Sequence, residues 1–500
     1  MEAINIVWFT KDLRLTDHAP LYHASLAGLP LLMVYCAAPS QTQHPTWSSR
    51  HSWFVHQSVI DIQLQLKPLK LPFWVQELEF IQFLELLQPW FQINTIYTHY
   101  FAVMQHSRKA LNEVEQFCTQ HHITLTQLPH NGLLPNQSAP LPPGQPAPNW
   151  LEHFKNHLKQ PLFNPNLNLI QTPHLPAPLT QQLHQYTPAK NWGKPDKTFK
   201  PDLPFLQPGA THAQHLLHTF LQHRASGYKK NQTSAHLSQT SGSRLSAHLT
   251  FGNISLKQIW QQIRLQNTPK ALQPALTAFK SNLLRRAYAL QLFEMHPQLE
   301  YQNFNYAVNG IRLKWNQDVF DTLLAAQTGF PLIDAAMRCL IQTGFINHRL
   351  RTLVMAFITN HLWLDWRKAT PVLAQLMTDF EPALFFWHTQ TAANCTGLEP
   401  IFLPDPAAEA KLTDKTGIFI KQWLPVFAHT PGGLCGNPAL MSALEQQLYH
   451  LEIGKHYPKP MVNLTTTTQY ALANLQRIYQ KNLAKKETAR LASVLPLPAF

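Results

Sequence analysis

The segment from Gln327 to Glu381 constrains the fold of this chain most, because it places charged side chains inside strongly apolar helical patterns. Asp334 and Arg338 lie one helical turn apart among apolar neighbours. Arg349 and Arg351 come directly before the apolar run LVMAFI, which we expect to be a buried helix. A chain with this pattern must place arginine side chains beside its core.

Two carboxylates, Asp379 and Glu381, follow after a break in the helical pattern. An arginine taken out of water needs a partner or a bound anion, because an orphaned buried charge costs about 3–5 kcal/mol. Two arginines and two carboxylates therefore predict an internal polar site. That site is either a salt-bridged helix junction or the floor of a cofactor pocket.

The overall charge of the chain is strongly basic. Its 500 residues contain 40 Lys and Arg against 27 Asp and Glu, which gives a net charge of +13 and a pI near 9.4. This balance favours a polyanionic partner such as DNA, because contacts to phosphates release counterions, although net charge also serves solubility alone. The length predicts two or more domains with ample cores. We also expect a monomer.

The five cysteines are scattered along the chain and include no CxxC pair. This spacing argues against a zinc site, an iron–sulfur cluster and a disulfide framework, so we expect no metal. The N-terminus lacks the order of a signal peptide, and no apolar run reaches the ~18–20 residues of a membrane span. A reducing, cytoplasmic location without membrane contact is therefore expected.

Short apolar runs alternate with amphipathic helical patterns over residues 1–134. This alternation predicts an α/β domain with a five-stranded, Rossmann-like parallel sheet. A GxGxxG dinucleotide fingerprint is absent. The expected strands are Ile4–Phe9, Leu29–Cys36, Leu71–Val75, Thr95–Tyr100 and Ile123–Leu128, and the expected helices include Ser52–Leu66 and Arg108–Gln120.

The rest of the chain follows other patterns. Residues 135–208 are dense in proline, which removes amide donors and disfavours helix, so we expect an interdomain linker laid over the surface. Trp150 and Phe154 within it indicate that it packs. Residues 209–485 have helical periodicity almost throughout and predict a large all-α domain. Residues 486–500 are expected to form a C-terminal tail.

The stretch Ser241-Gly242-Ser243-Arg244-Leu245-Ser246 precedes a helical pattern. Small residues and hydroxyls at the start of a helix offer hydrogen bonds to a phosphate, helped by the helix dipole. An ordinary helix N-cap is the alternative that the residues alone favour.

Several longer stretches match one family pattern, TG(Y/F)PLxDAAMRxLxxTGWxHNRxR followed by DWR and DxD. The chain has TGFPLIDAAMRCLIQTGFINHRLR, LDWR and DFE. Further similarity lies in VWFTKDLRLTDH, SGSRLSAHLTFGNIS, FIKQWLPVF and YPKPMVNL. On these motifs the chain resembles the photolyase/cryptochrome family. The resemblance implies an N-terminal antenna domain followed by a helical FAD-binding domain.

The resemblance also implies an antenna chromophore of the folate or deazaflavin type on the N-terminal domain. Met104 and Gln105 stand where folate-using members carry Asn-Glu, which argues against a folate. FAD remains the principal cofactor that the resemblance implies.

The resemblance assigns a set of cofactor contacts. Arg351 and Asp379 match a salt bridge beside the isoalloxazine, where a cation stabilises reduced, anionic flavin. Glu381 replaces a usual Asp, and Phe385 replaces an Asn that faces flavin N5 and can hydrogen-bond to it. The implied FAD contacts are Tyr228, Gly242, Ser243, Arg244, Leu245, Ser246, Arg286, Asn347, His348, Arg351, Asp379, Glu381 and Phe385.

Two other sets depart from the family pattern. Thr389 stands where the electron-transfer chain has its flavin-proximal Trp, while Trp366 and Trp315 match the middle and outer members. The aromatic walls of the pyrimidine-dimer pocket, where stacking is worth about 1–3 kcal/mol per base, are replaced. The candidates facing the lesion or DNA are Asn282, Arg285, Thr352 and Thr391, with Arg349 in an adjoining basic groove.

Two functions of different classes remain open. The first is light-driven repair of UV pyrimidine dimers in DNA by electron transfer from reduced FAD, a carbon–carbon lyase activity, which the fold and the FAD-loop residues favour. The second is a non-repairing, cryptochrome-like photosensor or nucleic-acid-binding homologue, which the altered pocket and interrupted Trp chain favour. A remnant that no longer binds FAD is a third interpretation.

Overall fold

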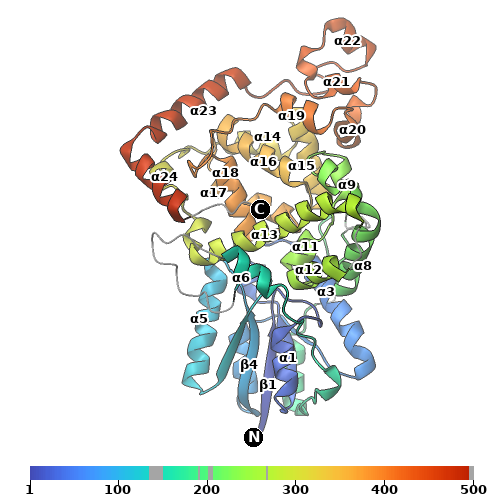
Figure 1. The fold of residues 1–500 in the computed structure, drawn as a ribbon, viewed down its shortest axis with the longest axis vertical. Helices are drawn as coiled ribbons and strands as arrows, with labels where there is room; N and C mark the ends of the chain where they lie inside the picture. The colour runs from blue at the N-terminus through green and yellow to red at the C-terminus, as the bar shows by residue number, and fades with distance from the viewer. Residues whose placement is uncertain (135–149, 190–191, 201–205, 266–268, 495–500) are drawn as a thin grey trace.

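The computed structural model describes residues 1–134, 150–189, 192–200, 206–265 and 269–494. Figure 1 shows two parts stacked along the long axis of the molecule: a sheet with its helices, which holds the N-terminus, and a larger helical part. Helix α13 (Gln273–Met295) crosses the helical part near its junction with the sheet domain. The predicted fold class, an α/β domain followed by an all-α domain, is confirmed.

The sheet has five strands in the order β3-β2-β1-β4-β5, and every neighbouring pair is parallel. Val7 of the central strand lies opposite Met33 on one side and Tyr97 on the other. Apolar, β-branched and aromatic residues fill the strands, as burial on both faces requires. The strands are β1 (Glu2–Phe9), β2 (Leu31–Cys36), β3 (Trp74–Gln76), β4 (Phe91–Tyr100) and β5 (Thr124–Pro129).

Helices cover both faces of the sheet, because alternate side chains of each strand point to opposite faces. One face packs against α1 (Ala19–Leu26) and α3 (Ser49–Leu66). The other face packs against α4 (Phe80–Leu87) and α5 (Gln105–Gln120). The strand order reverses between β1 and β4, so their carboxyl ends form the crevice where open α/β sheets bind ligands.

The remaining helices form most of the second domain and the segment that leads to it. They are α2 (Pro39–Thr42), α6 (Trp150–His157), α7 (Ala177–Gln185), α8 (Ala210–Thr219), α9 (Ala225–Asn231), α10 (Leu237–Ser241), α11 (Ser246–Thr250), α12 (Leu256–Leu265), α14 (Gln317–Leu324), α15 (Pro331–Thr343), α16 (His348–Ala356), α17 (Trp366–Leu376), α18 (Pro382–Ala392), α19 (Pro406–Thr413), α20 (Ile418–Trp423), α21 (Gly432–Cys435), α22 (Ala443–Leu448), α23 (Leu464–Tyr479) and α24 (Asn482–Val494).

The proline-dense segment is not confined to the surface where the structure describes it. Trp150 and Phe154 of α6 are 5% and 1% exposed and lie in a core of the helical domain. Leu179 and Leu183 of α7 are buried in the core of the sheet domain. Apolar residues between the prolines therefore join this segment to both cores. Residues 135–149 and 201–205 of the predicted linker lie outside the described residues.

The predicted C-terminal tail begins inside helix α24. Leu491 of this helix is 3% exposed, and its Ala484 is fully buried. The apolar face of the helix thus continues across the boundary expected at residue 485. Residues 495–500 lie outside the described residues.

The two domains pack closely at the carboxyl end of β1. Arg50 on α3 is 2% exposed and donates hydrogen bonds to three carbonyl oxygens of the helical domain, those of Leu340, Ile341 and Leu376. Gly252 has φ +69°, and a Cβ there would lie 2.1 Å from the Lys11 carbonyl oxygen. A residue larger than glycine would force the domains apart at this point.

A buried carboxylate fixes the loop after β1. Asp12 accepts hydrogen bonds from the Thr10 amide and from His99 Nδ1, and His18 Nε2 lies 3.0 Å from the same carboxylate. Burial opposes ionisation, but the charge of His18 and both imidazoles hold the pKa of Asp12 well below its usual value. The three side chains lie close enough to hold a metal ion. His18 Nδ1 accepts the Leu21 amide, so the other ring nitrogen, Nε2, is the one that faces the carboxylate.

Among the described residues, no helix combines the length and the apolar character that crossing a membrane requires. All five cysteines are free and buried.

Candidate functional site

Two ion pairs form the floor of the predicted site. Arg351 on α16 donates through Nη2 to both carboxylate oxygens of Asp379, at 2.9 and 2.8 Å. Arg286 on α13 donates to the Glu381 carboxylate at 2.6 Å. The two acidic side chains are 4% and 7% exposed, so the pairs are largely removed from water. Arg351–Asp379 and Arg286–Glu381 are called the floor pairs below.

The other charges of the segment that begins at Gln327 have local structural roles. Asp334, fully buried, accepts hydrogen bonds from Thr328 and Gly329 and from the Tyr457 hydroxyl. Burial raises the pKa of Asp334. Arg338 lies one turn away and donates to the Trp423 carbonyl oxygen. Asp334 therefore closes the turn before α15.

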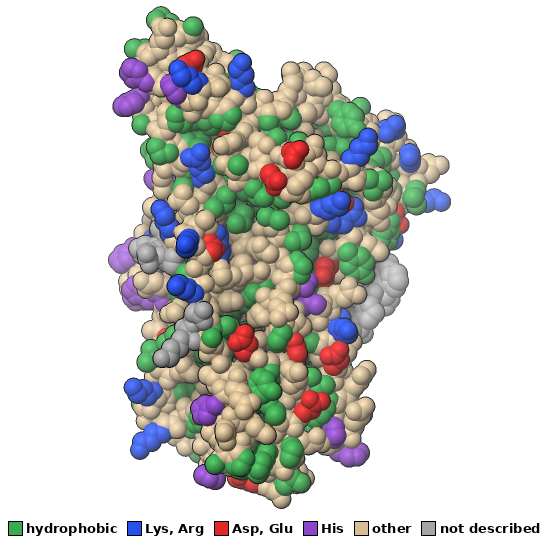
Figure 2. Space-filling view, turned by 180° about the vertical axis from the view of Figure 1, so that it is seen from behind, with side chains coloured by type: hydrophobic (Ala, Val, Ile, Leu, Met, Phe, Trp, Pro, Cys, Tyr) green, Lys and Arg blue, Asp and Glu red, His purple; other side chains and the backbone are tan. Residues whose placement is uncertain are grey.

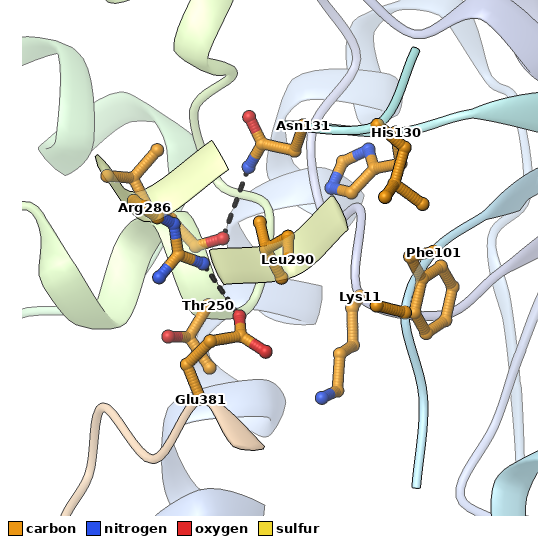
Figure 3. A pocket seen from close by; sticks show the side chains of 11 residues that line it. Lys11, Phe101, His130, Asn131, Thr250, Arg286, Leu290 and Glu381 are labelled. Atoms are coloured by element: carbon orange, nitrogen blue, oxygen red, sulfur yellow. Dashed lines mark hydrogen bonds and ion pairs between the residues drawn. The ribbon is translucent and has the colours of Figure 1, made fainter. Parts of the chain in front are cut away.

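A cavity adjoins the Arg286–Glu381 pair at the boundary between the domains (Figure 3). Lys11, from the end of β1, and His130, which follows β5, also line it. Both ring nitrogens of His130 and Nε of Arg286 are buried without a hydrogen-bond partner in the described part of the chain. These unsatisfied groups make the cavity suited to a polar ligand or to water.

The loop at residues 241–246 lies beside two arginines. Arg224 donates to the carbonyl oxygens of Gly242 and Leu216. Burial and the neighbouring charge of Arg244 lower the pKa of Arg224 to about 10. Two guanidinium groups beside small, hydroxyl-bearing residues fit a phosphate-bearing ligand. The loop is also tight, because a Cβ on Gly242 would lie 2.8 Å from the Ser238 carbonyl oxygen.

Tyr228 on α9 lies directly against α13. Its hydroxyl accepts a hydrogen bond from the Asn282 side-chain amide at 2.8 Å. Its ring packs edge-on against Phe220 and Phe279. A residue predicted to contact FAD and a residue predicted to face the lesion are therefore in direct contact.

Asn347 is committed to local structure. Its Oδ1 accepts the Leu350 amide as the N-cap of α16, and its Nδ2 donates to the Ser234 carbonyl and the Ser238 hydroxyl. These bonds connect α16 to the segment before the loop at 241–246. Asn347 therefore positions the site, while its side chain has no free donor for a ligand.

A second polar group, called the outer cluster, lies around the rings of His348 and His388, whose centres are 4.2 Å apart. Removal from water is the largest cause that lowers the pKa of both histidines; Arg351 and Arg285 add to it at His348, and His348 itself adds to it at His388. The Thr352 hydroxyl donates to the His348 carbonyl oxygen. The outer cluster consists of Asn282, Arg285, His348, Thr352 and His388.

Arg349 and Thr391, both predicted to face DNA, are engaged within the fold. Arg349 donates through Nε to Glu409 at 2.8 Å, and the Thr391 hydroxyl donates to the Trp387 carbonyl oxygen. Figure 2 shows one face on which Lys and Arg side chains are dispersed rather than gathered into a single patch. Arg285, whose side chain is exposed, remains a predicted DNA contact.

Aromatic side chains form a series behind the floor pairs. The ring of Phe385 lies 5.9 Å from that of Phe386, and the ring of Phe386 lies 5.9 Å from that of Trp366, between ring centres. Trp366 is 2% exposed. Trp315 packs separately, against Phe320. The predicted middle Trp is thus connected to Phe385 through Phe386, which the sequence did not single out.

A second cavity lies beside the carboxyl ends of β1, β2 and β4. Met104, at the position considered for a folate, lines it together with His44 and His106. The two imidazole rings are stacked with centres 3.9 Å apart. The cavity occupies the crevice expected for a ligand of such a sheet, and an antenna chromophore there stays a prediction.

Several residues of the site lie outside the sequence-based prediction. Lys11 and His130 come from the sheet domain, and Phe386 and His388 come from α18. A signal was available for Lys11, because it ends the apolar run of a strand at the expected edge of the sheet. His130, Phe386 and His388 carry no local signal that distinguishes them from core or surface residues.

Two family models match the chain. The model described as the FAD binding domain of DNA photolyase matches residues 279–477, and the model described as DNA photolyase matches residues 5–177. The first covers the helices that carry both floor pairs, and the second covers the parallel sheet. The chain belongs to the DNA photolyase/cryptochrome family.

Relatives of both kinds within the photolyase/cryptochrome family match most of the chain. Cryptochrome DASH from Synechocystis sp. is 25% identical over 483 residues, which cover 92% of this chain and 95% of that protein. Deoxyribodipyrimidine photo-lyase from Vibrio cholerae is 24% identical over 482 residues, covering 92% and 98%. A crystal structure of a bacterial class III photolyase from Agrobacterium tumefaciens shares the fold, with a TM-score of 0.79 at 23% identity over 96% of this chain and 98% of that chain.

The helical part of this photolyase/cryptochrome chain is an FAD-binding domain, and its residues fit the cofactor. Arg286 keeps a buried, unsatisfied Nε, and Arg224 donates to the loop at 241–246, which itself carries Arg244. The floor pairs place cations next to carboxylates in a site of low exposure. The role of each residue toward FAD stays a prediction.

Proposed function

We propose that this protein is a blue-light flavoprotein that uses reduced FAD to repair UV-induced pyrimidine dimers in DNA. One observation carries the proposal: both floor pairs, whose carboxylates are buried, lie within the FAD-binding domain. When bound, FAD supplies light absorption and the electron that is donated to the dimer. The protein supplies binding, orientation and a fixed electrostatic environment.

Arg351 is the residue we propose to stabilise negative charge on the cofactor. Its Nη2 is held by Asp379, and its Nε donates to the Ile346 carbonyl oxygen at 2.8 Å. Three hydrogen bonds fix the guanidinium before any ligand arrives, so little conformational entropy remains to be lost on binding. Asp379 would keep Arg351 oriented, and Glu381 would do the same for Arg286.

The loop at 241–246 is proposed to hold the pyrophosphate of FAD. Ser243 and Ser246 would donate hydroxyl hydrogen bonds, while Arg244 and Arg224 supply positive charge nearby. Tyr228, packed between Phe220 and Phe279, would border the cofactor on the α9 side. Phe385 would exclude water from the flavin, since it offers no hydrogen bond.

The outer cluster is proposed to face the DNA. Asn282 and Arg285 lie one turn apart on α13, and Arg285 Nη1 lies 3.5 Å from Asn282 Oδ1. Arg285 would contact a phosphate, and Asn282 and the imidazoles would hydrogen-bond to the edges of extruded bases. Recognition of this kind depends on hydrogen bonds more than on stacking.

A cryptochrome-like role without repair is the second candidate, and the composition of the outer cluster favours it. Its members are amide, hydroxyl, imidazole and guanidinium groups, and none of these five residues offers the large aromatic face used to stack a flipped base. Thr389, at the position of the flavin-proximal Trp, is buried at 3% exposure and cannot replace that Trp in electron transfer.

The deciding experiment starts with the absorption spectrum of the purified protein. We expect a flavin band at about one FAD per chain. The flavin is then reduced chemically, which bypasses the Trp chain, and the protein is illuminated with an oligonucleotide that contains one thymine dimer. Controls are the same mixture in the dark and an undamaged oligonucleotide.

Each outcome separates the candidates. Loss of the dimer in the illuminated sample, but not in the dark control, would establish repair. Bound FAD without repair, and without preference for the damaged oligonucleotide, would favour the cryptochrome-like role. A protein that fails to take up added FAD would overturn both.

A further inference from the structure

Lys11 occupies an unusual place between the two domains. It follows β1 of the sheet domain and lines the cavity next to Arg286 and Glu381, which belong to the helical domain. Figure 3 shows its side chain extended, with the ammonium group directed toward the side of the cavity where Glu381 lies. The backbone around Lys11 is fixed by the close approach of Gly252.

The ammonium group of Lys11 has no hydrogen bond or ion pair among the described residues. Burial lowers the pKa of Lys11, and the charge of Arg286 lowers it further, while Glu381 acts in the opposite direction. Glu381 is already bonded to Arg286 at 2.6 Å. The cavity therefore contains two cations and one carboxylate, an excess of one positive charge.

The cavity has further unsatisfied hydrogen-bonding capacity. His130 is 6% exposed, and neither of its ring nitrogens has a partner within the described residues. Nε of Arg286 is also buried without a hydrogen-bond partner in the described part of the chain. Buried polar groups are normally satisfied, so a cavity with a spare positive charge and several free nitrogens is built for an anionic or polar group.

We propose that Lys11 belongs to the flavin site and stabilises the negative charge that FAD gains on reduction. The inference rests on the proposed function, because Arg286 and Glu381 are the residues through which the cavity joins the predicted FAD contacts. Lys11 also borders the second cavity, where burial lowers the pKa of both His44 and His106 and so disfavours their charged forms. Among the residues that line the two cavities, the charged neighbours of Lys11 from the helical domain, Arg286 and Glu381, belong to the first cavity.

This arrangement would make the sheet domain a contributor to the redox chemistry of the helical domain. A cation near the flavin favours the reduced, negatively charged form over the oxidised, neutral form. Removing it should shift the equilibrium toward oxidised FAD by at least about tenfold, which corresponds to about 30 mV for a two-electron couple.

The test compares Lys11→Met and Lys11→Arg in the flavin-loaded protein. The midpoint potential of FAD is measured by following its absorbance during reduction against a reference dye. Lys67→Met is the matched control, because Lys67 is an exposed lysine of the same domain. We expect Lys11→Met to lower the potential, Lys11→Arg to keep it near the wild-type value, and the control to leave it unchanged.

The stability of the apoprotein provides a second readout. Since the Lys11 ammonium has no partner in the described protein, Lys11→Met should unfold at the same or a higher denaturant concentration than wild type. A purely structural role for Lys11 would lower that concentration instead. If wild-type protein binds FAD and Lys11→Met leaves its potential unchanged, the inference is wrong while the proposed function stands. If wild-type protein binds no FAD, the proposed function itself fails.

Discussion

The floor pairs and the outer cluster lie close together but are built on different principles. In the floor pairs, arginine meets a buried carboxylate, and the partners come from segments 28 and 95 residues apart in the sequence. In the outer cluster, Thr352 bonds to its own helix and Arg285 is exposed. The floor therefore depends on tertiary structure for its stability, whereas the outer cluster depends on it only for its position.

Under the proposed function, this difference separates the site of the cofactor from the site of the substrate. If the floor pairs hold FAD as proposed, a change in one of them should disturb both folding and FAD binding, because it leaves a charge unpaired. A change in the outer cluster should alter what binds next to FAD and leave the fold almost intact. The replacement in a floor pair, Glu381, keeps the charge of the family's Asp, whereas those in the outer cluster, Asn282 and Arg285, change the chemical character of the side chain.

Replacing Asp379 by Asn should have the largest effect and tests the floor directly. The partner of a fully buried ion pair costs about 3–5 kcal/mol when orphaned, and Arg351 is 23% exposed, so we expect a loss of about 2–4 kcal/mol. The purified variant should also lose most of its FAD. Urea unfolding and flavin absorbance measure the two effects.

The matched control for that variant is Glu487→Gln, which breaks the more exposed Arg490–Glu487 pair on α24. A surface pair of this kind should contribute less than about 1 kcal/mol and leave FAD in place. Equal losses in both variants would show that the floor pairs have no special role.

Replacing Trp366 by Phe probes the aromatic series behind the floor. The change removes part of a fully buried ring and the hydrogen bond from its indole N–H to Asn303, at 2.8 Å. We expect a loss of about 1–3 kcal/mol in unfolding free energy, together with slower photoreduction of bound FAD. Trp315→Phe is the companion variant: it should cost less stability, because Trp315 is only partly buried, and it tests the predicted outer member of the same chain. If blue light reduces the flavin at the same rate in all three proteins, Trp366 is a packing residue only.

Acid should destabilise the region near the domain junction. His51, His99 and His248 are buried, and burial lowers their pKa values to about 4, 3 and 3. In the unfolded state these imidazoles become protonated near pH 6.5, whereas in the folded state they stay neutral down to a lower pH. The unfolding free energy should therefore be fully present above pH 6.5 and fall as the pH drops toward 4, by about 1.4 kcal/mol per pH unit for each group.

The pH dependence has its own matched pair. His248→Gln should flatten the slope between pH 6.5 and 4, whereas His184→Gln, at an exposed position of α7, should leave it unchanged. Asp12, whose pKa is lowered, acts in a separate window below its usual value of 3.8. A wild-type slope of zero above pH 4 would contradict the assignment of neutral buried imidazoles.

Arg285→Ala should have the smallest effect on the fold. It tests the outer cluster, the second member of the comparison. If Arg285 contacts a DNA phosphate, its removal weakens binding across sequences and reduces the salt slope of the affinity by about 1. Arg349→Ala is the informative companion, since Arg349 is bonded to Glu409. That variant should lose stability with little change in the salt slope. Fluorescence anisotropy with duplex DNA at several salt concentrations measures both, and the reverse result would exchange the two roles.

Much of the fold could be predicted because its signals are local. Five apolar runs separated by amphipathic helices gave the strands and helices of the sheet domain, and the strand positions agree within a few residues in most cases. The structure of the linker was harder to predict, because its many prolines argue against helix. It nevertheless contains two short helices, each with an apolar face that packs into one of the cores. The sequence shows that residues such as Phe154 and Leu179 are apolar, but their burial depends on which surface they meet.

The site divides in the same way. Arginines and carboxylates within apolar patterns predicted an internal polar site, and the resemblance to the family associated Arg351 with Asp379. The partners of the other arginines could not be predicted, since Arg349 and Glu409 are 60 residues apart and Arg286 and Glu381 are 95 apart. Periodicity carries no information about contacts over such separations.

The sequence by itself determined that this protein has a parallel sheet, a helical domain and charges that must be buried, because hydrophobic periodicity and the cost of unpaired charge act on local patterns. Only the tertiary structure decided which charges meet. It joined Arg286 to Glu381, placed His348 against His388, and brought Lys11 of the sheet domain into one cavity with Arg286 and Glu381 of the helical domain. The physical reason is that electrostatic and packing energies depend on distance in space, and the packing of the two domains sets those distances.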